Sequence, residues 1–146
     1  MNPTLYKGGS YSDERGNIRF VNEKIPGNYK RFYLITPANS DTIRAWQGHK
    51  FEKKSFYAIS GGFIIAVVKP SHFEVPGEDE IPEFFKLTKD NNALLYIPGG
   101  CYTGIKSIDA SSILLVLSEF DLAESKKDDY RQPPSKWVDW SSISLD

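Results

Sequence analysis

Turn-forming residues divide this chain into short segments, and this division constrains the fold more than any other feature of the sequence. Glycine, proline, asparagine and serine recur about every 8–12 residues, a spacing typical of an all-β sandwich or barrel. Residues 17–25 alternate polar and apolar side chains, which predicts a half-buried strand. Residues 63–70 are strongly apolar and β-branched, which predicts a central strand. No segment carries a long apolar stripe with helical spacing, so we predict an all-β, double-sheet jelly roll.

The same signals place the remaining elements along the chain. We predict strands at residues 29–36, 42–50, 54–60, 83–89, 93–98, 105–108 and 111–120. Residues 99–104, "GGCYTG", are predicted to form a turn, and only residues 121–131 favour a helix or turn. The sequence has no internal repeat, low-complexity tract or linker, so we predict a single domain over residues 1–146.

Composition and charge exclude several classes of partner. The chain has 146 residues and a net charge of -1, so no basic field recruits nucleic acid. No apolar run reaches the roughly 20 residues of a membrane-spanning helix, and residues 1–16 lack the apolar core of a signal peptide. Cys101 is the only cysteine, which rules out an intrachain disulfide. We therefore expect a cytoplasmic protein in a reducing compartment, with neither nucleic acid nor a membrane as partner.

Three stretches of the sequence carry a resemblance to a known family. They are residues 13–35, with "DERGNIRFVNE" before "KRFYLI"; residues 44–68, "RAWQGHKFEKKSFYAISGGFIIAVV"; and residues 93–131, with "ALLYIPGGCYTGI" before "SSILLVLSEFDLAESKKDDYR". In this order and spacing they resemble the sugar-nucleotide branch of the cupins. That branch contains the dTDP-4-dehydrorhamnose 3,5-epimerases and the dTDP-sugar 3,4-ketoisomerases, and the resemblance covers most of the chain.

The resemblance implies a fold, an assembly and an activity. The fold is a cupin jelly roll (a double-stranded β-helix), the assembly is a homodimer, and a pocket in each barrel takes a nucleotide-diphosphate keto-sugar. Proton transfer in the family is done by side chains, with no metal and no cofactor. We therefore expect a metal-free isomerase or epimerase that acts on a dTDP-4-keto-6-deoxyhexose in surface polysaccharide biosynthesis. Two alternatives stay open: a catalytically degenerate cupin that binds a nucleotide sugar as a scaffold or regulatory partner, and a structural jelly roll without a sugar ligand.

The sequence departs from the family pattern at several positions. The ketoisomerases carry an arginine and two histidines in the second stretch; Arg44 and His49 match, whereas Gln47 replaces the first histidine. The 3,5-epimerases place their essential base at the same position, and glutamine cannot take up a proton near neutral pH. Thr103 stands where many epimerases and metal-binding cupins have a histidine, and residues 111–120 offer no counterpart of the epimerases' tyrosine acid. The 3,5-epimerase machinery is therefore largely missing.

Three residues are the candidates for proton transfer. The resemblance implies that His49 is the general base, since histidine has a pKa of about 6.5. It also implies that Tyr33 is an acid or an orienting group and that the charge of Lys54 stabilises an enolate oxygen. The alternatives are a surface histidine, a core tyrosine and an exposed hairpin lysine at these positions.

Four residues are the candidates for substrate binding. Arg44 presents a planar fork that suits a diphosphate, and Gln47 can hydrogen-bond a sugar hydroxyl or carbonyl. Tyr102, as a stacking platform or proton donor, and Thr103 complete the predicted set. The alternatives are an arginine in solvent, drift at the glutamine after a loss of catalysis, and core packing of the tyrosine. No metal site is predicted, because lysines at 53–54 stand where a metal cupin needs a carboxylate.

Strand alternation brings the central candidates together. Ala45, Gln47 and His49 alternate along one face of the predicted strand at 42–50, and we expect this face to line the pocket. Four other candidates are expected to pack or to lie at the surface: His72, Cys101, Trp137 and Trp140.

Overall fold

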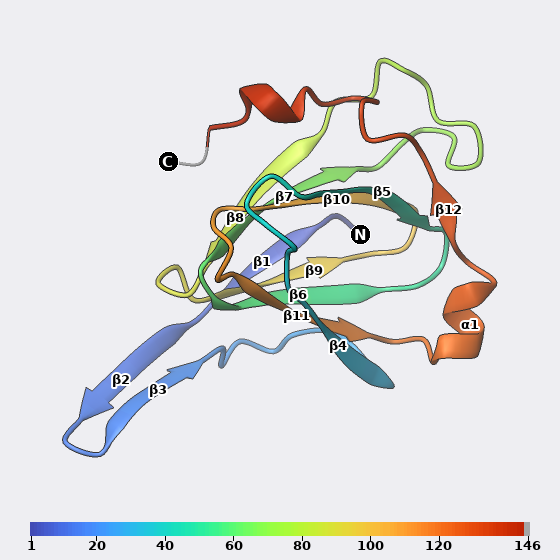
Figure 1. Cartoon of the computed structure of the whole chain (residues 1–146). Helices are drawn as coiled ribbons and strands as arrows, with labels where there is room; N and C mark the ends of the chain where they lie inside the picture. Colours follow the sequence, from blue (N-terminus) through green and yellow to red (C-terminus); the bar gives the residue numbers. More distant parts are fainter. Residues whose placement is uncertain (145–146) are drawn as a thin grey trace.

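Two antiparallel sheets, packed face to face, form the body of the protein (Figure 1). The structure is a computed structural model that describes residues 1–144. In these residues the first sheet has the strand order β1 (Thr4–Lys7), β9 (Ala93–Ile97), β6 (Lys54–Ser60), β11 (Ile113–Ser118) and β4 (Arg31–Ile35). The second has the order β12 (Tyr130–Arg131), β5 (Ile43–His49), β10 (Cys101–Ser107), β7 (Gly62–Val68) and β8 (Glu83–Thr88). A hairpin of β2 (Gly9–Asp13) and β3 (Gly16–Phe20) projects from this body, and the predicted all-β jelly roll is confirmed.

Strand β7 illustrates how the apolar sequence builds the core. All of its residues are buried, as its continuous apolar sequence predicts for a central strand. Phe63, Ile65 and Val67 point into the main core between the sheets, whereas Ala66 and Val68 point outward into a second apolar cluster. Burial of each large side chain contributes roughly 1.5–3 kcal/mol relative to exposure. Both faces of this strand therefore stabilise the fold.

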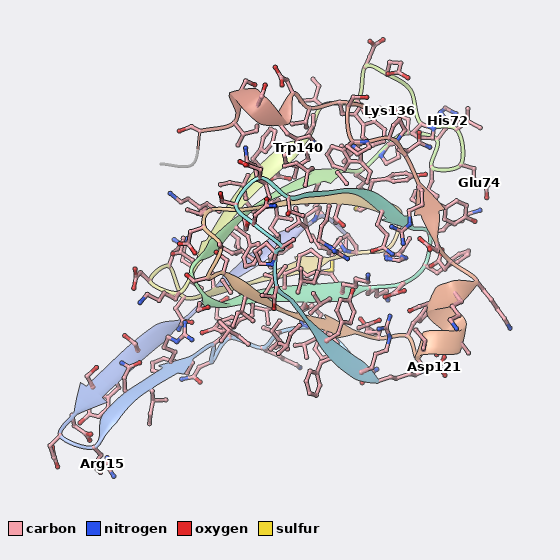
Figure 2. The ribbon with its side chains drawn as sticks, viewed as in Figure 1. Arg15, His72, Glu74, Asp121, Lys136 and Trp140 are labelled. Atoms are coloured by element: carbon pink, nitrogen blue, oxygen red, sulfur yellow. The ribbon has the colours of Figure 1, made fainter. Side chains whose placement is uncertain are left out.

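The C-terminal tail after β12 covers the outer face of the second sheet and creates the second cluster (Figure 2). Trp140 packs against Trp46, with ring centroids 5.6 Å apart, and its indole nitrogen donates a hydrogen bond of 2.9 Å to the carbonyl of Pro134. A Cβ atom on Gly104 would lie only 2.6 Å from the Trp140 ring, so the close approach of the tail requires glycine there. Trp137 packs against the same cluster, and the predicted packing role of both tail tryptophans is confirmed.

Two predictions about local structure are wrong. The turn predicted at 99–104 is confined to Gly99 and Gly100, because β10 already begins at Cys101. β10 is paired on both sides, with β5 and with β7, and this tertiary pairing outweighs the local turn signal. The strand predicted at 17–25 ends early, since β3 spans Gly16–Phe20, and β1 and β2 were hidden by the glycines near the N-terminus.

The helix α1 (Leu122–Lys126) lies in the segment that the sequence favours for a helix or turn. It begins after Asp121, whose carboxylate accepts a hydrogen bond of 2.8 Å from the Glu124 amide, while the Glu124 carboxylate accepts one of 3.0 Å from the Asp121 amide. This capping box stabilises the first turn by about 1 kcal/mol. Neither α1 nor any other helix in residues 1–144 is long and apolar enough to cross a membrane.

Candidate active site

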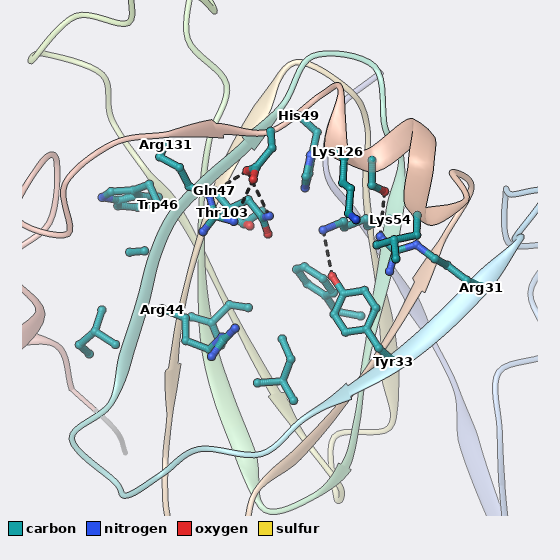
Figure 3. Close-up of a pocket in the computed structure, with 18 residues that line it drawn as sticks. Arg31, Tyr33, Arg44, Trp46, Gln47, His49, Lys54, Thr103, Lys126 and Arg131 are labelled. Carbon is teal, nitrogen blue, oxygen red and sulfur yellow. Dashed lines mark hydrogen bonds and ion pairs between the residues drawn. The ribbon is translucent and has the colours of Figure 1, made fainter.

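A cavity of about 560 Å³ lies between the two sheets, at the end where α1 and β12 are found (Figure 3). Its volume is within the range of small-molecule sites. The walls come from β4, β5, β6, β10 and the segment from α1 to β12. They include six of the seven predicted site residues: Tyr33, Arg44, Gln47, His49, Lys54 and Thr103. The fold therefore gathers residues from distant parts of the sequence around one space.

Strand β5 supplies one wall of the cavity, and the alternation of its side chains between the two faces of the sheet is interrupted once. Gln47 and His49 line the cavity, as the predicted alternation requires. The register with β10 then shifts by one residue: Thr103 pairs with Gln47, whereas Ile105 pairs with Arg44. This β-bulge gives β5 one extra residue and changes the phase of its side chains. For this reason Arg44 also lines the cavity, although strict alternation would turn it to the other face.

His49 is held with one ring nitrogen bonded and the other free. Its Nδ1 lies 2.6 Å from the backbone carbonyl of Asp128, and a carbonyl only accepts, so Nδ1 carries a proton. Its Nε2 is buried and has no hydrogen-bond partner among the described residues. Burial is the largest influence on the ring and lowers its pKa, Lys54 lowers the pKa further, and the Asp128 carbonyl and Glu52 oppose this shift. Nε2 is therefore an available base at neutral pH.

Lys54 and Tyr33, from the sheet that faces β5, form a hydrogen-bonded pair (Figure 3). The ammonium of Lys54 donates to the Tyr33 hydroxyl oxygen at 2.9 Å, and the Lys54 residue is only 5% exposed. The alternative of an exposed hairpin lysine is therefore wrong for Lys54, although its neighbour Lys53 is exposed. The pair offers a positive charge and a hydroxyl proton at the same place in the cavity.

A buried carboxylate that no sequence pattern indicates, Glu52, lies behind these groups. Both oxygens of Glu52 accept hydroxyl hydrogen bonds, from Ser118 at 2.7 Å and from Ser125 at 2.6 Å. Lys54 Nζ lies 3.6 Å from one oxygen, and His49 Nδ1 lies 3.5 Å from the other. In the sequence this glutamate belongs to the charged run "KFEKK", which has the composition of a solvated turn. No local signal distinguishes it from its exposed neighbours.

Asp128, which no local sequence pattern indicates either, joins the C-terminal segment to strand β5 and the turn after it. Its carboxylate accepts three backbone hydrogen bonds in the turn after β5, from Lys50 at 2.7 Å and from Phe51 and Glu52 at 2.8 Å each. The same residue supplies the carbonyl that orients His49. The resemblance covers this acidic tail, but the sequence offers no sign that it returns to a turn almost eighty positions earlier.

The cavity wall is strongly cationic. Five positive side chains line it: Arg31, Arg44, Lys54, Lys126 and Arg131. Among the described residues of the lining, the one acidic side chain is Asp129, and its ion pair with Arg131 at 2.7 Å lowers the pKa of the carboxyl group. Gln47 donates a long hydrogen bond of 3.4 Å to the same carboxylate. Such a wall suits a ligand with several negative charges.

The structure places Tyr102 away from this cavity, and its predicted binding role is corrected. Its ring is buried in the second cluster on the outer face of the sheet and stacks on Phe73, and its hydroxyl donates to the Phe73 carbonyl at 3.0 Å. Adjacent residues on a strand face opposite ways, so Tyr102 and Thr103 cannot both line one cavity wall. Cys101 is buried, and burial raises the pKa of its thiol to about 11, which fits the predicted packing role. His72 is exposed, as predicted.

The residues that could hold a metal do not gather at this site. In the described part of the chain, residues 1–144, no three or more His, Cys, Asp or Glu side chains lie together as metal ligands. The cavity offers instead one imidazole and several ammonium and guanidinium groups, which repel a cation. The metal-free and cofactor-free site stays a prediction.

Comparison with solved structures shows the same fold in enzymes of nucleotide-sugar metabolism. The 3,4-ketoisomerase QdtA from Thermoanaerobacterium thermosaccharolyticum, as a mutant in complex with TDP-4-keto-6-deoxyglucose, is 23% identical with a TM-score of 0.71, over 90% of this chain and 88% of that chain. The dTDP-4-dehydrorhamnose 3,5-epimerase of Bacillus anthracis, with TDP and PPi bound, is 16% identical with a TM-score of 0.76, over 97% and 86% of the two chains. A dTDP sugar isomerase from Desulfovibrio desulfuricans is 16% identical with a TM-score of 0.75, over 98% and 93%.

Comparison of sequences identifies the family. No curated protein matches this chain. The family described as "FdtA: WxcM-like, C-terminal" matches residues 1–140, which is nearly the whole sequence. This match agrees with the resemblance to sugar-nucleotide cupins carried by the three stretches quoted above. The chain therefore belongs to the FdtA family, WxcM-like, C-terminal.

Proposed function

We propose that this protein, as a single domain over residues 1–146, isomerises or epimerises a nucleotide-linked 4-keto-6-deoxyhexose by metal-free proton transfer. The observation that carries the proposal is the free, buried Nε2 of His49 in a cavity lined by five cations. An unprotonated imidazole beside fixed positive charge is the arrangement needed to remove a proton next to a ketone. Family membership and the TDP-sugar complex of the related ketoisomerase support the same class of substrate.

The chemistry divides between the two walls of the cavity. His49 Nε2 takes the proton from the carbon next to the ketone, and the electron pair moves into an enolate. The ammonium of Lys54 stabilises the enolate oxygen, and the Tyr33 hydroxyl, 2.9 Å from that ammonium, donates or orients a proton. Return of the proton to the other face of the same carbon gives epimerisation. Its return to the former carbonyl carbon, with exchange of protons between the two oxygens, gives ketoisomerisation.

The substrate's phosphates fit the positive charge at the mouth of the cavity. Arg44 is exposed there and offers a planar fork for a diphosphate, and Arg131 and Lys126 lie on the wall formed by α1 and β12. Gln47 and Thr103, paired across β5 and β10, are the proposed contacts for sugar hydroxyls. The negative charge of a diphosphate would balance the positive charge of this wall.

Incubation with TDP-4-keto-6-deoxyglucose in heavy water, followed by proton NMR, tests the activity. We expect deuterium to enter the sugar at the carbon next to the ketone and a new isomer to accumulate. A protein that binds TDP in a thermal-shift assay but exchanges no proton would instead be a degenerate binding cupin. That second candidate is favoured by one observation, the replacement of the family histidine by Gln47. A protein that shows no proton exchange and no TDP binding would contradict both candidates.

We also propose a homodimer in the cytoplasm, acting in surface polysaccharide biosynthesis. The outer face of β4 carries Phe32 and Leu34, which are 68% and 54% exposed, and the projecting hairpin exposes Tyr11 and Ile18. Exposed apolar side chains of this size mark surfaces that other proteins cover. Sedimentation should give the mass of a dimer for the wild type and of a monomer for Phe32→Glu. A monomeric wild type would contradict the dimer and leave the proposed reaction open.

A further inference from the structure

One buried carboxylate is shared by the two groups to which proton transfer is assigned. Glu52 is 1% exposed, and the side chains that face it come from five elements, β4, β5, β6, β11 and α1: Arg31, His49, Lys54, Ser118 and Ser125. We propose that Glu52 is a positioning residue whose negative charge allows an ammonium and a proton-accepting imidazole to act side by side. This inference rests on the proposed function for its catalytic consequence, but its electrostatic part can be measured without substrate.

The charge of Glu52 must be balanced by cations, because the hydroxyl groups that bond it are neutral. Ser118 and Ser125 donate to its two oxygens, and Ser125 in turn accepts from Arg31 at 2.8 Å. An isolated carboxylate in this position would cost far more than two hydroxyl contacts return. Lys54 at 3.6 Å and Arg31 at 3.8 Å supply the compensating charge. The carboxylate therefore belongs to a network that also fixes the ammonium.

Glu52 compensates the charge of the buried Lys54 ammonium. Burial takes an ammonium out of water, and a nearby anion offsets the cost of that lost hydration. The hydroxyl of Tyr33, its hydrogen-bond partner at 2.9 Å, is neutral and cannot balance the charge. Glu52 is the carboxylate beside the ammonium, so it stabilises, at this buried position, the positive charge to which we assign stabilisation of the enolate oxygen.

His49 presents the opposite difficulty, since it must accept a proton beside that same ammonium. Burial and Lys54 both lower its pKa, so an imidazolium would be strongly disfavoured by these two alone. Glu52 Oε1 lies 3.5 Å from Nδ1, too far for a strong hydrogen bond but close enough for a substantial charge interaction. Nδ1 already donates to the Asp128 carbonyl, so Glu52 acts through its charge and leaves the ring orientation to Asp128. One anion thus serves two cations that would otherwise repel each other.

The test is the isosteric, neutral variant Glu52→Gln, followed by NMR titration of the histidine rings. The chain has two histidines, so exposed His72 serves as the internal reference signal. We expect the His49 midpoint to move to lower pH in Glu52→Gln, and to stay near its wild-type position in Glu52→Asp, which keeps the charge. With substrate, kcat should fall roughly 100-fold while KM stays within about threefold. The matched control is Glu74→Gln, which removes an exposed carboxylate and should change neither quantity.

Two results would overturn the inference. One is a folded Glu52→Gln protein whose His49 titration matches the wild type, which would make Glu52 merely structural. The other is a loss of kcat that Glu52→Asp does not restore in part. If Glu52→Gln does not fold, Lys54→Met is compared with the double variant Glu52→Gln/Lys54→Met. The single variant should raise the His49 midpoint and the double variant should bring it back, and equal midpoints would refute the proposal. A wild type without turnover would refute the proposed function, whereas the titration result would stand.

Discussion

The two ends of the cavity are built in different ways. At the inner end, His49, Lys54 and Glu52 are buried, and each has at least one contact within 2.9 Å that fixes its position. At the outer end, Arg44 and Arg131 are exposed, and their long side chains reach the cavity from the edges of two neighbouring strands. The inner groups are shielded from salt. The outer groups are screened by it, although Arg131 is also held by Asp129 at 2.7 Å.

This difference separates the expected tasks of the two ends. Proton transfer requires a base and a charge held within a fraction of an ångström of the reacting atoms, which only the inner end provides. A phosphate carries charge over several oxygens and can be held by mobile cations in more than one arrangement. Substitutions at the inner end should therefore change turnover and stability, and substitutions at the outer end should change affinity and its dependence on salt.

The largest expected effect is the loss of the base in His49→Gln. Removal of a general base costs about 10²–10⁴ in rate, and TDP affinity should stay within about threefold because the outer cations are untouched. Turnover and calorimetric titration with TDP measure the two quantities. His72→Gln, at an exposed histidine, is the control and should match the wild type. Turnover within tenfold of the wild type in His49→Gln would remove His49 from the mechanism.

Lys54→Met should combine a loss of turnover with a loss of stability. It leaves the buried Glu52 with Arg31 as its remaining cation at 3.8 Å, and an uncompensated buried charge costs about 3 kcal/mol. Urea unfolding should show this loss, and the double variant Glu52→Gln/Lys54→Met should recover most of the stability but none of the turnover. If the double variant is less stable than the single one, the two charges are not coupled.

Arg44→Ala tests the outer end. We expect TDP affinity to fall about tenfold and kcat to change less than threefold, if the guanidinium contacts phosphate and not the reacting carbon, as we propose. The dependence of affinity on salt should also become weaker. Lys53→Ala removes an exposed cation outside the cavity lining and is the matched control. A loss of kcat with unchanged affinity would reverse the tasks assigned to the two ends.

Gln47→His tests the wall between the two ends, where the family histidine is replaced. The new imidazole would lie beside Asp129, which already accepts a hydrogen bond from the glutamine amide at 3.4 Å. We expect a gain of a few-fold in proton exchange at the sugar, because a second base becomes available. Exchange into the substrate in heavy water measures the gain. A variant that binds TDP normally and exchanges no faster would show that the replacement at 47 is not what limits the rate.

The sequence predicts the fold and some of the residues that line the cavity. The apolar run of β7 and the alternation of Gln47 and His49 follow from local patterns, and both are confirmed. The position of Arg44 depends on a β-bulge that arises only from pairing with β10. The predicted binding role of Tyr102 is wrong because the turn signal at residues 99–104 conceals the start of β10, whose alternation turns Tyr102 away from the cavity. Glu52 owes its burial to partners that local patterns do not identify.

The smallest expected effect is on the pH dependence of stability, and it belongs to the inner end alone. Burial lowers the pKa of His49 from its ordinary 6.5, so the unfolded chain binds more protons than the folded chain between the lowered value and 6.5. Stability should therefore be complete above this window and fall as the pH drops through it. The carboxyl group of Asp129 also has a lowered pKa, but from 3.8, so its loss comes at lower pH. Urea unfolding between about pH 8 and pH 5 should give a slope that vanishes in His49→Gln and persists in His72→Gln. An equal slope in both variants would mean that the imidazole is not held neutral by its burial, and the contrast between the two ends of the cavity would lose its electrostatic basis.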